Sequence, residues 1–330
     1  MIQHPGVLAL LLASGLVSLM LTAAGWQGFQ ILRGWNLQSG SEGQLDLERR
    51  TYLVSTLVAT ALVIQILSLF LFIFTADGLH TQFVGAMCAA GSLAANSFGY
   101  PTLLAKVATC LVAGVWLILH RADTQGYDYP LIRPKYVLLL ILVPLVLTES
   151  WLQVRYLTGL KADVMTSCCG SLFGQGRQGF AAELAGLPTR IMQPVFWTTL
   201  GAFVVSGILL LRTRRGAAAF SILSLAFFLV SVTSLVSFFC LYIYELPSHH
   251  CPFCLLQREY GLVGYPLYGA MLGGAIVGLG VGALAPFRAR KSLAAALPRM
   301  QARLAWSALI LALMFTLIVG IWMLVSPLKL

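Results

Sequence analysis

Charged residues are scarce in this sequence of 330 residues, since Asp, Glu, Lys and Arg make up 10% of it and hydrophobic residues make up 59%. Soluble globular domains carry about 25% charged residues, so this composition excludes an ordinary soluble domain. Crossing a bilayer takes roughly 20 apolar residues. The sequence therefore predicts an all-α polytopic membrane protein of about eight transmembrane helices, at residues 7–27, 52–76, 101–120, 136–151, 192–211, 220–244, 255–284 and 304–325.

Acidic residues are also few, with 11 Asp and Glu against 21 Lys and Arg, which gives a net charge of +10. The basic residues are not spread evenly, because most of them lie in alternate loops between the expected spans. Positive charge favours the cytoplasmic side of a membrane. We therefore expect both termini, and the loops at residues 77–100, 152–190 and 245–254, to face outward. The basic excess indicates orientation and not a site for a polyanion.

The chain divides at the polar inner loop of residues 121–135. The first half, residues 1–125, holds three spans and the outer loop 77–100, and its role is not assigned. The second half, residues 126–330, holds five spans and most of the recognisable chemistry.

Five of the seven cysteines fall in the expected outward loops: Cys88, Cys168, Cys169, Cys251 and Cys254. The other two, Cys110 and Cys240, lie inside expected spans, where a cysteine is a small buried hydrophobe. An outward position means an oxidising compartment, in which disulfides form and persist.

The segment "SHHCPFCLLQREYGL" (residues 248–262) carries two of the outward cysteines and an arginine. If the seventh helix begins at this motif, Cys251, Cys254 and Arg258 lie on one face of it. The positive end of a helix favours a thiolate there. Arg258 near hydrocarbon needs a partner, such as a ring oxygen that becomes negative on reduction, or Glu259. A structural disulfide beside a snorkelling arginine is the alternative.

Cys168 and Cys169 are adjacent, and a disulfide between neighbouring cysteines is strained and easily reduced. Glycines at 170, 174, 176 and 179 surround this pair. Reactive sulfurs in an outer loop beside a fixed pair at a helix mouth suit thiol–disulfide exchange, with an electron acceptor in the bilayer. Cys88 is a candidate for a further relay thiol.

Residues 136–284 resemble the vitamin K epoxide reductase family and, more distantly, the DsbB-type thiol–quinone oxidoreductases. The likeness rests on the order of a helix, the loop "TSCCGSLFGQGRQGF", two further helices and a Cys-x-x-Cys-x-x-x-Arg motif. Adjacent loop cysteines depart from the family pattern, and the first half has no counterpart in it.

The resemblance implies a four-helix redox module with one extra C-terminal span, in a bacterial inner membrane, with its cysteines on the periplasmic face. Its cofactor would be a quinone, ubiquinone or menaquinone, in contact with Arg258 and Gln193. Its partner would be an extracytoplasmic thioredoxin-fold protein that exchanges a disulfide with Cys168 or Cys169, from which electrons pass to Cys251 and Cys254.

Two other functions remain open. One is binding or transport of a soft metal such as mercury, copper or zinc, for which the possible ligands are His249, His250, Cys251 and Cys254, or the adjacent pair Cys168 and Cys169. A transporter should carry cysteines or acids along the bilayer midplane, but the sulfurs gather on one face, which favours redox exchange. A non-catalytic subunit of an electron-transfer complex would need histidine haem ligands inside spans, and all of the five histidines lie at helix ends or in loops. Glu149, inside the fourth span, is a candidate proton relay or a solvated helix-end residue.

Overall fold

The computed structural model describes residues 3–36, 42–161, 166 and 186–328. Among these residues there is no strand, and eight helices are long and apolar enough to cross a membrane. The prediction of an all-α polytopic membrane protein is therefore confirmed. The long helices are α1 (Pro5–Gly34), α2 (Glu42–Gly78), α4 (Gly99–Asp123), α5 (Ile132–Thr158), α8 (Thr189–Thr213), α9 (Ala217–Ser234), α11 (Gly264–Ala283) and α12 (Ala296–Val325).

Short elements join or extend these helices. The sixth span continues from α9 through a π-helical turn, η2 (Leu235–Phe239), into α10 (Cys240–Tyr244). The others are η1 (His80–Gln82), α3 (Ala89–Leu93), η3 (Cys254–Leu256), η4 (Arg258–Tyr260), η5 (Ala285–Phe287) and η6 (Lys291–Leu293).

Contacts group the chain into two compact units. Unit 1 comprises residues 1–73, 96–160 and 283–301, and unit 2 comprises residues 74–95, 161–282 and 302–330. The loop after α2 thus belongs with the second set of helices, and α5 belongs with the first. The division at residue 125, which separates the chain by function, stays a prediction.

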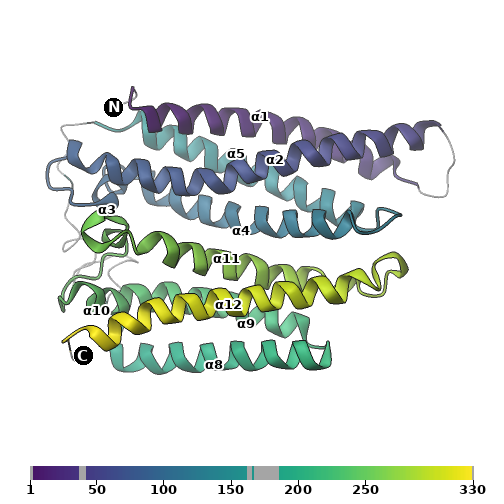
Figure 1. Ribbon diagram of the computed structural model, residues 1–330. Helices are drawn as coiled ribbons and strands as arrows, with labels where there is room; N and C mark the ends of the chain where they lie inside the picture. Colours follow the sequence, from purple (N-terminus) through teal and green to yellow (C-terminus); the bar gives the residue numbers. More distant parts are fainter. Residues whose placement is uncertain (1–2, 37–41, 162–165, 167–185, 329–330) are drawn as a thin grey trace. The chain divides into compact units, whose positions relative to one another are not determined.

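Unit 1 is built from α1, α2, α4 and α5, which run along one another (Figure 1). Its core contains residues from all four helices, among them Val17, Val58, Trp116 and Leu139, each fully buried. Trp116 donates from its indole N–H to the backbone oxygen of Lys135 at 3.0 Å, so the largest core side chain also has its polar atom satisfied.

Ionised side chains lie inside unit 1. The Lys106 ammonium is 2.7 Å from Glu149 Oε1 and donates to Ser68 Oγ at 3.0 Å, and Gln65 donates to the other carboxylate oxygen of Glu149. These four residues join α2, α4 and α5, and Lys106 and Glu149 are 2% and 0% exposed. A second buried pair joins Lys135 to Asp123 at 2.6 Å. The alternative that Glu149 is solvated at a helix end is therefore wrong.

Unit 2 contains α8, α9, η2, α10, α11 and most of α12. Helices α9 and α11 approach closely, because glycines on α11 face serines on α9. A Cβ atom on Gly278 would lie 1.9 Å from Ser224 Oγ, and one on Gly282 would lie 2.4 Å from Ser221 Cβ. Small residues spaced by four on one helix allow this close approach in membrane proteins.

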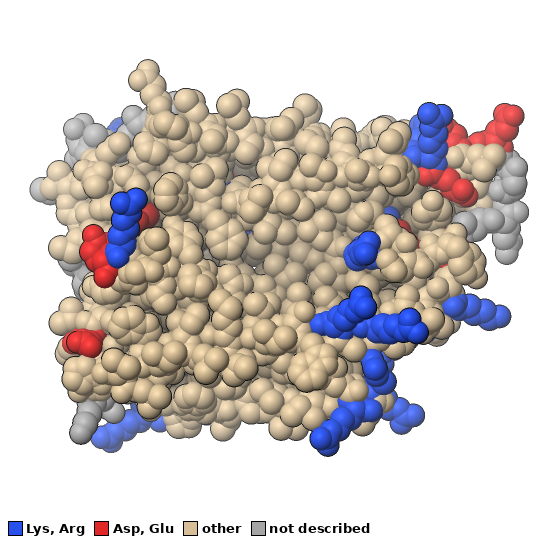
Figure 2. Space-filling model, viewed as in Figure 1, with Lys and Arg blue, Asp and Glu red and all other residues tan. Residues whose placement is uncertain are grey.

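The outer surface of the spans is apolar. Leu12, Trp26, Leu67, Ile222 and Ile310 are each more than half exposed. On the face drawn in Figure 2, the charged side chains lie near the ends of the helices, and a broad area without charge lies between them. Exposed apolar surface on this scale marks contact with lipid.

Candidate functional site

Three cysteines of unit 2 form a buried cluster, which we call the cysteine cluster: Cys88, Cys251 and Cys254. Their sulfur atoms all lie within 4.8 Å of one another. Cys88 Sγ is 3.6 Å from Cys251 Sγ, a hydrogen-bonding separation and not that of a covalent disulfide, which is about 2.05 Å. Cys88 and Cys251 are fully buried and Cys254 is 4% exposed. A Cys-x-x-Cys pair thus has a third sulfur within exchange distance.

The short helix α3 positions Cys88, which is its N-cap residue. The carboxylate of Asp77, at the end of α2, accepts a hydrogen bond from Ala89 N at 3.1 Å, so the first turn of α3 is capped from outside. The side chain of Gln257 donates to the backbone oxygen of Met87 at 2.6 Å. That bond ties the segment before Cys88 to the segment after Cys254.

The chain that leads to the two loop cysteines also reaches this region. Thr166 N donates to Val84 O at 3.0 Å. Gly85 adopts φ +88°, and a Cβ there would lie 2.5 Å from Thr166 O, so only glycine allows this approach. Cys168 and Cys169 follow two and three residues after Thr166, and both lie outside the described residues.

The CPFC motif does not open a helix, so the expectation that the seventh helix begins there is wrong. Two 3₁₀ turns, η3 and η4, precede α11, which begins at Gly264. The Tyr244 hydroxyl donates to Cys251 O at 2.6 Å, and the Tyr268 hydroxyl donates to Pro252 O. The carbonyl oxygens of Cys251 and Pro252 therefore accept hydrogen bonds from tyrosine side chains of α10 and α11, and not from backbone N–H groups of a helix.

The chain also turns sharply between the motif and α11. Gly261 and Leu262 have φ of +65° and +56°, which is left-handed backbone that a continuous helix excludes. As a result Cys251, Cys254 and Arg258 do not share one helix face. Arg258 lies in η4 and its side chain is exposed.

The two histidines before the motif have different surroundings. His250 Nδ1 contacts Val236 O at 2.9 Å, a carbonyl of the π-helical turn η2. Such a turn leaves carbonyls without their usual helical partners. His249 Nε2 instead lies 3.4 Å from Cys254 Sγ. Burial lowers the pKa of His249, and the nearby Cys88 acts in the opposite direction. The net effect keeps the pKa of His249 below its ordinary value.

The remaining residues that the sequence singled out lie elsewhere. Gln193, on α8, donates to the hydroxyl of Tyr242 at 3.2 Å. Cys110 and Cys240 are buried as expected, and the Cys240 thiol donates to Cys251 O at 3.7 Å. Glu149 belongs to unit 1, where Lys106 pairs with it, and its role as a proton relay stays a prediction.

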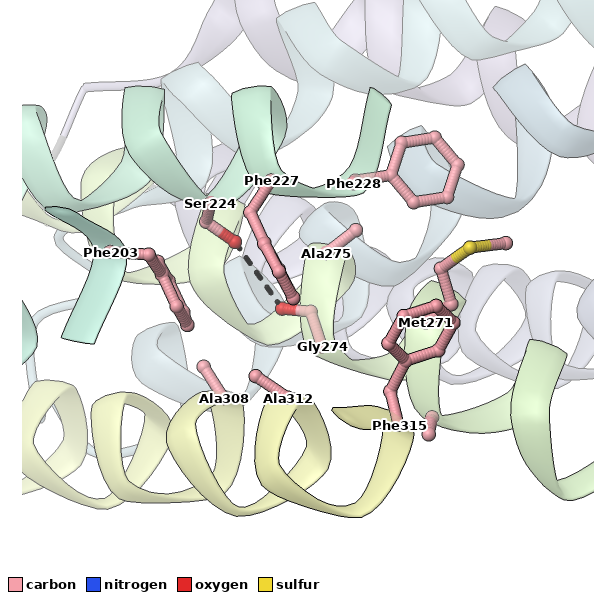
Figure 3. A pocket seen from close by; sticks show the side chains of 11 residues that line it. Phe203, Ser224, Phe227, Phe228, Met271, Gly274, Ala275, Ala308, Ala312 and Phe315 are labelled. Carbon is pink, nitrogen blue, oxygen red and sulfur yellow. Dashed lines mark hydrogen bonds between the residues drawn. The ribbon is translucent and has the colours of Figure 1, made fainter. Parts of the chain in front are cut away.

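Unit 2 also contains a small apolar cavity among α8, α9, α11 and α12 (Figure 3). Phe203, Phe227 and Phe315 line it, and Ser224 donates to Gly274 O at its edge at 3.5 Å. Its volume is about 10 Å³, which is close to the least that holds one water molecule. A quinone ring does not fit into this cavity.

Comparison of the chain with protein-family models, with curated proteins and with solved structures gave no match. The likeness to vitamin K epoxide reductases thus stays a hypothesis. Any function proposed for this chain therefore has to be argued from the geometry of the cysteine cluster.

Proposed function

We propose that this chain is a membrane thiol–quinone oxidoreductase whose reactive centre is the cysteine cluster. The observation that supports this most is the 3.6 Å separation of Cys88 Sγ and Cys251 Sγ, next to Cys254. A thiolate attacks a disulfide by approaching one of its sulfurs directly. A disulfide at Cys251–Cys254 would have Cys88 at such a distance.

The proposed reaction begins with a partner of thioredoxin fold on the periplasmic side of a bacterial inner membrane. Its dithiol is oxidised as it reduces a disulfide that includes Cys168 or Cys169, and further exchange reduces the Cys251–Cys254 disulfide. Reoxidation of that pair releases two electrons and two protons. The thiol of Cys88 would take part in the exchange between the loop cysteines and the CPFC motif.

A quinone, ubiquinone or menaquinone, would supply the two-electron acceptor that becomes a hydroquinone. The tight apolar interior of unit 2 argues for a position at the surface of the motif. Arg258 is exposed four residues after Cys254, so its guanidinium is available to stabilise a negative ring oxygen. Gln193 would be a second contact only if it left the hydroxyl of Tyr242.

The test is turnover of the purified full chain with a dithiol donor and a short-chain, water-soluble quinone. We expect quinone reduction by the wild-type protein and its loss in Cys254→Ser and Cys251→Ser. Cys110→Ser, a buried cysteine of unit 1, is the matched control and should retain turnover. Undiminished turnover in Cys254→Ser would refute the proposed reaction.

A further inference from the structure

The three sulfurs of the cysteine cluster have the spacing of three ligands around one metal ion, and His249 Nε2 lies beside one of them, Cys254 Sγ. A tetrahedral zinc ion, with Zn–S bonds of about 2.3 Å and a Zn–N bond of about 2.0 Å, separates two sulfurs by about 3.8 Å and a sulfur from the nitrogen by about 3.5 Å. Cys88 Sγ and Cys251 Sγ are 3.6 Å apart, and His249 Nε2 is 3.4 Å from Cys254 Sγ. All three sulfurs lie within 4.8 Å of one another, whereas His249 is not part of that group, so its imidazole has to turn further toward Cys88 and Cys251 to become the fourth ligand.

The chemistry of these groups selects the class of metal. Three thiolates and one imidazole form a soft set that suits Zn²⁺ and other thiophilic ions better than Mg²⁺ or Ca²⁺. The set differs from the one that the sequence indicated, because Cys88 takes part and His250 does not. His250 Nδ1 is occupied by Val236 O, whereas His249 Nε2 points to the cluster.

The surroundings hold these ligands in position. Tyr244 and Tyr268 fix the backbone of Cys251 and Pro252, and Gln257 ties the motif to the Cys88 segment. Edge contact with Tyr244, at 4.4 Å between ring centroids, also orients the His249 ring. Supporting contacts of this kind strengthen metal binding, because the ligands need little reordering when the ion enters.

We propose that the reduced cluster, Cys88, Cys251 and Cys254 with His249, is a binding site for one zinc-class ion. Binding to the three thiols releases three protons. When a quinone takes two electrons from any two of these thiolates and two protons from solvent, it becomes a hydroquinone, the two sulfurs form a disulfide, and the ion leaves because it has lost two ligands. This last step rests on the proposed function. It implies that a bound ion would hold the three thiols reduced and block thiol–disulfide exchange.

The experiment titrates the reduced full chain in detergent with Co²⁺, followed by displacement with Zn²⁺. We expect one Co²⁺ per chain, with thiolate-to-metal charge-transfer absorption and the visible bands of tetrahedral cobalt. Cys88→Ser and His249→Ala should each weaken binding more than about tenfold. His249→Cys, which replaces nitrogen by sulfur, should keep the site and strengthen the charge-transfer band, and this retention shows that the fold survives substitution there.

Two further variants separate this site from other thiols. Cys110→Ser should bind cobalt as the wild type does. Retained binding in the double variant Cys168→Ser/Cys169→Ser would separate the proposed site from one built on the adjacent loop cysteines. Loss of binding in that double variant, wild-type affinity in Cys88→Ser, or no stoichiometric binding at all would each overturn the inference.

The titration contains neither quinone nor redox partner, so its outcome does not depend on turnover. A chain that binds cobalt but reduces no quinone refutes the proposed function and leaves the metal site standing. A chain that reduces quinone but binds no cobalt supports the proposed function and refutes the metal site. If both hold, stoichiometric Zn²⁺ should inhibit turnover, and a chelator should restore it.

Discussion

Lys106 and Glu149 are ionisable side chains in the interior of a membrane unit, and each is costly to bury alone. Their 2.7 Å contact, with hydrogen bonds from Lys106 to Ser68 and from Gln65 to Glu149, compensates both charges. Breaking a buried pair by removing one partner typically costs about 3–5 kcal/mol, whereas replacing both by apolar groups costs far less.

We therefore expect Lys106→Met to lower the free energy of unfolding of unit 1 by about 3–5 kcal/mol, because Glu149 is left without its partner. The double variant Lys106→Met/Glu149→Leu should recover most of that loss. Denaturant or thermal unfolding in detergent measures both. Lys291→Met is the control, since Lys291 is exposed. Equal losses in the single and the double variant would mean that packing and not charge holds the three helices together.

At the scale of helices, the α9–α11 contact of unit 2 depends on small residues. Gly278 lies against Ser224 so closely that an added methyl group would overlap both Oγ at 1.9 Å and Cβ at 2.5 Å. The serine Cβ cannot move away without its backbone, so the helices would have to separate. Helix α11 also provides Tyr268, whose hydroxyl donates to Pro252 O in the CPFC motif.

Gly278→Ala should consequently destabilise unit 2 by about 1–3 kcal/mol, the usual cost of overpacking a filled interior. Gly269→Ala is the matched control on the same helix, because nothing lies within 4 Å of its added Cβ. There alanine should leave stability unchanged or raise it by up to about 1 kcal/mol through its better helix propensity. Thermal unfolding measures both variants, and equal stability of the two would contradict this account of the contact.

The same helices show what could be predicted from the sequence. All eight spans follow from hydropathy, because a segment that must satisfy its backbone in lipid has little choice but to be helical. The start of α11 was predicted wrongly, since the tyrosine bonds to Cys251 and Pro252 and the positive φ of Leu262 depend on tertiary contacts.

Cys88 was recognised only as a candidate relay thiol. Its sulfur meets Cys251 across a sequence separation of 163 residues, and no spacing pattern shows which loops pack together over that distance. Only the three-dimensional arrangement of the two loops reveals such a pair. His249 and His250 could likewise not be distinguished by sequence, because a carbonyl of the π-helical turn decides which of them faces the sulfurs.

At the scale of the whole molecule, the direction of insertion decides which compartment the cysteine cluster meets. The last turn of α8 carries Arg212 and the loop that follows it carries Arg214 and Arg215, whereas the segment between α10 and α11 carries Arg258 as its only Lys or Arg. Because basic residues near span ends are retained on the cytoplasmic side, the first loop should be cytoplasmic and the cysteine segment periplasmic. With the eight spans found among the described residues, Pro5 and Val325 should then lie on the periplasmic side as well.

Reporter fusions test this orientation. Alkaline phosphatase, which needs disulfides that form only outside the cytoplasm, should be active when it is fused after Val325 and inactive when it is fused after Arg214. A green fluorescent reporter that folds in the cytoplasm should give the opposite pattern at the same two positions. If alkaline phosphatase were instead active only after Arg214, the cluster would face a compartment that keeps thiols reduced. Exchange with a periplasmic partner would then be impossible, whereas zinc binding by the reduced cluster would remain possible.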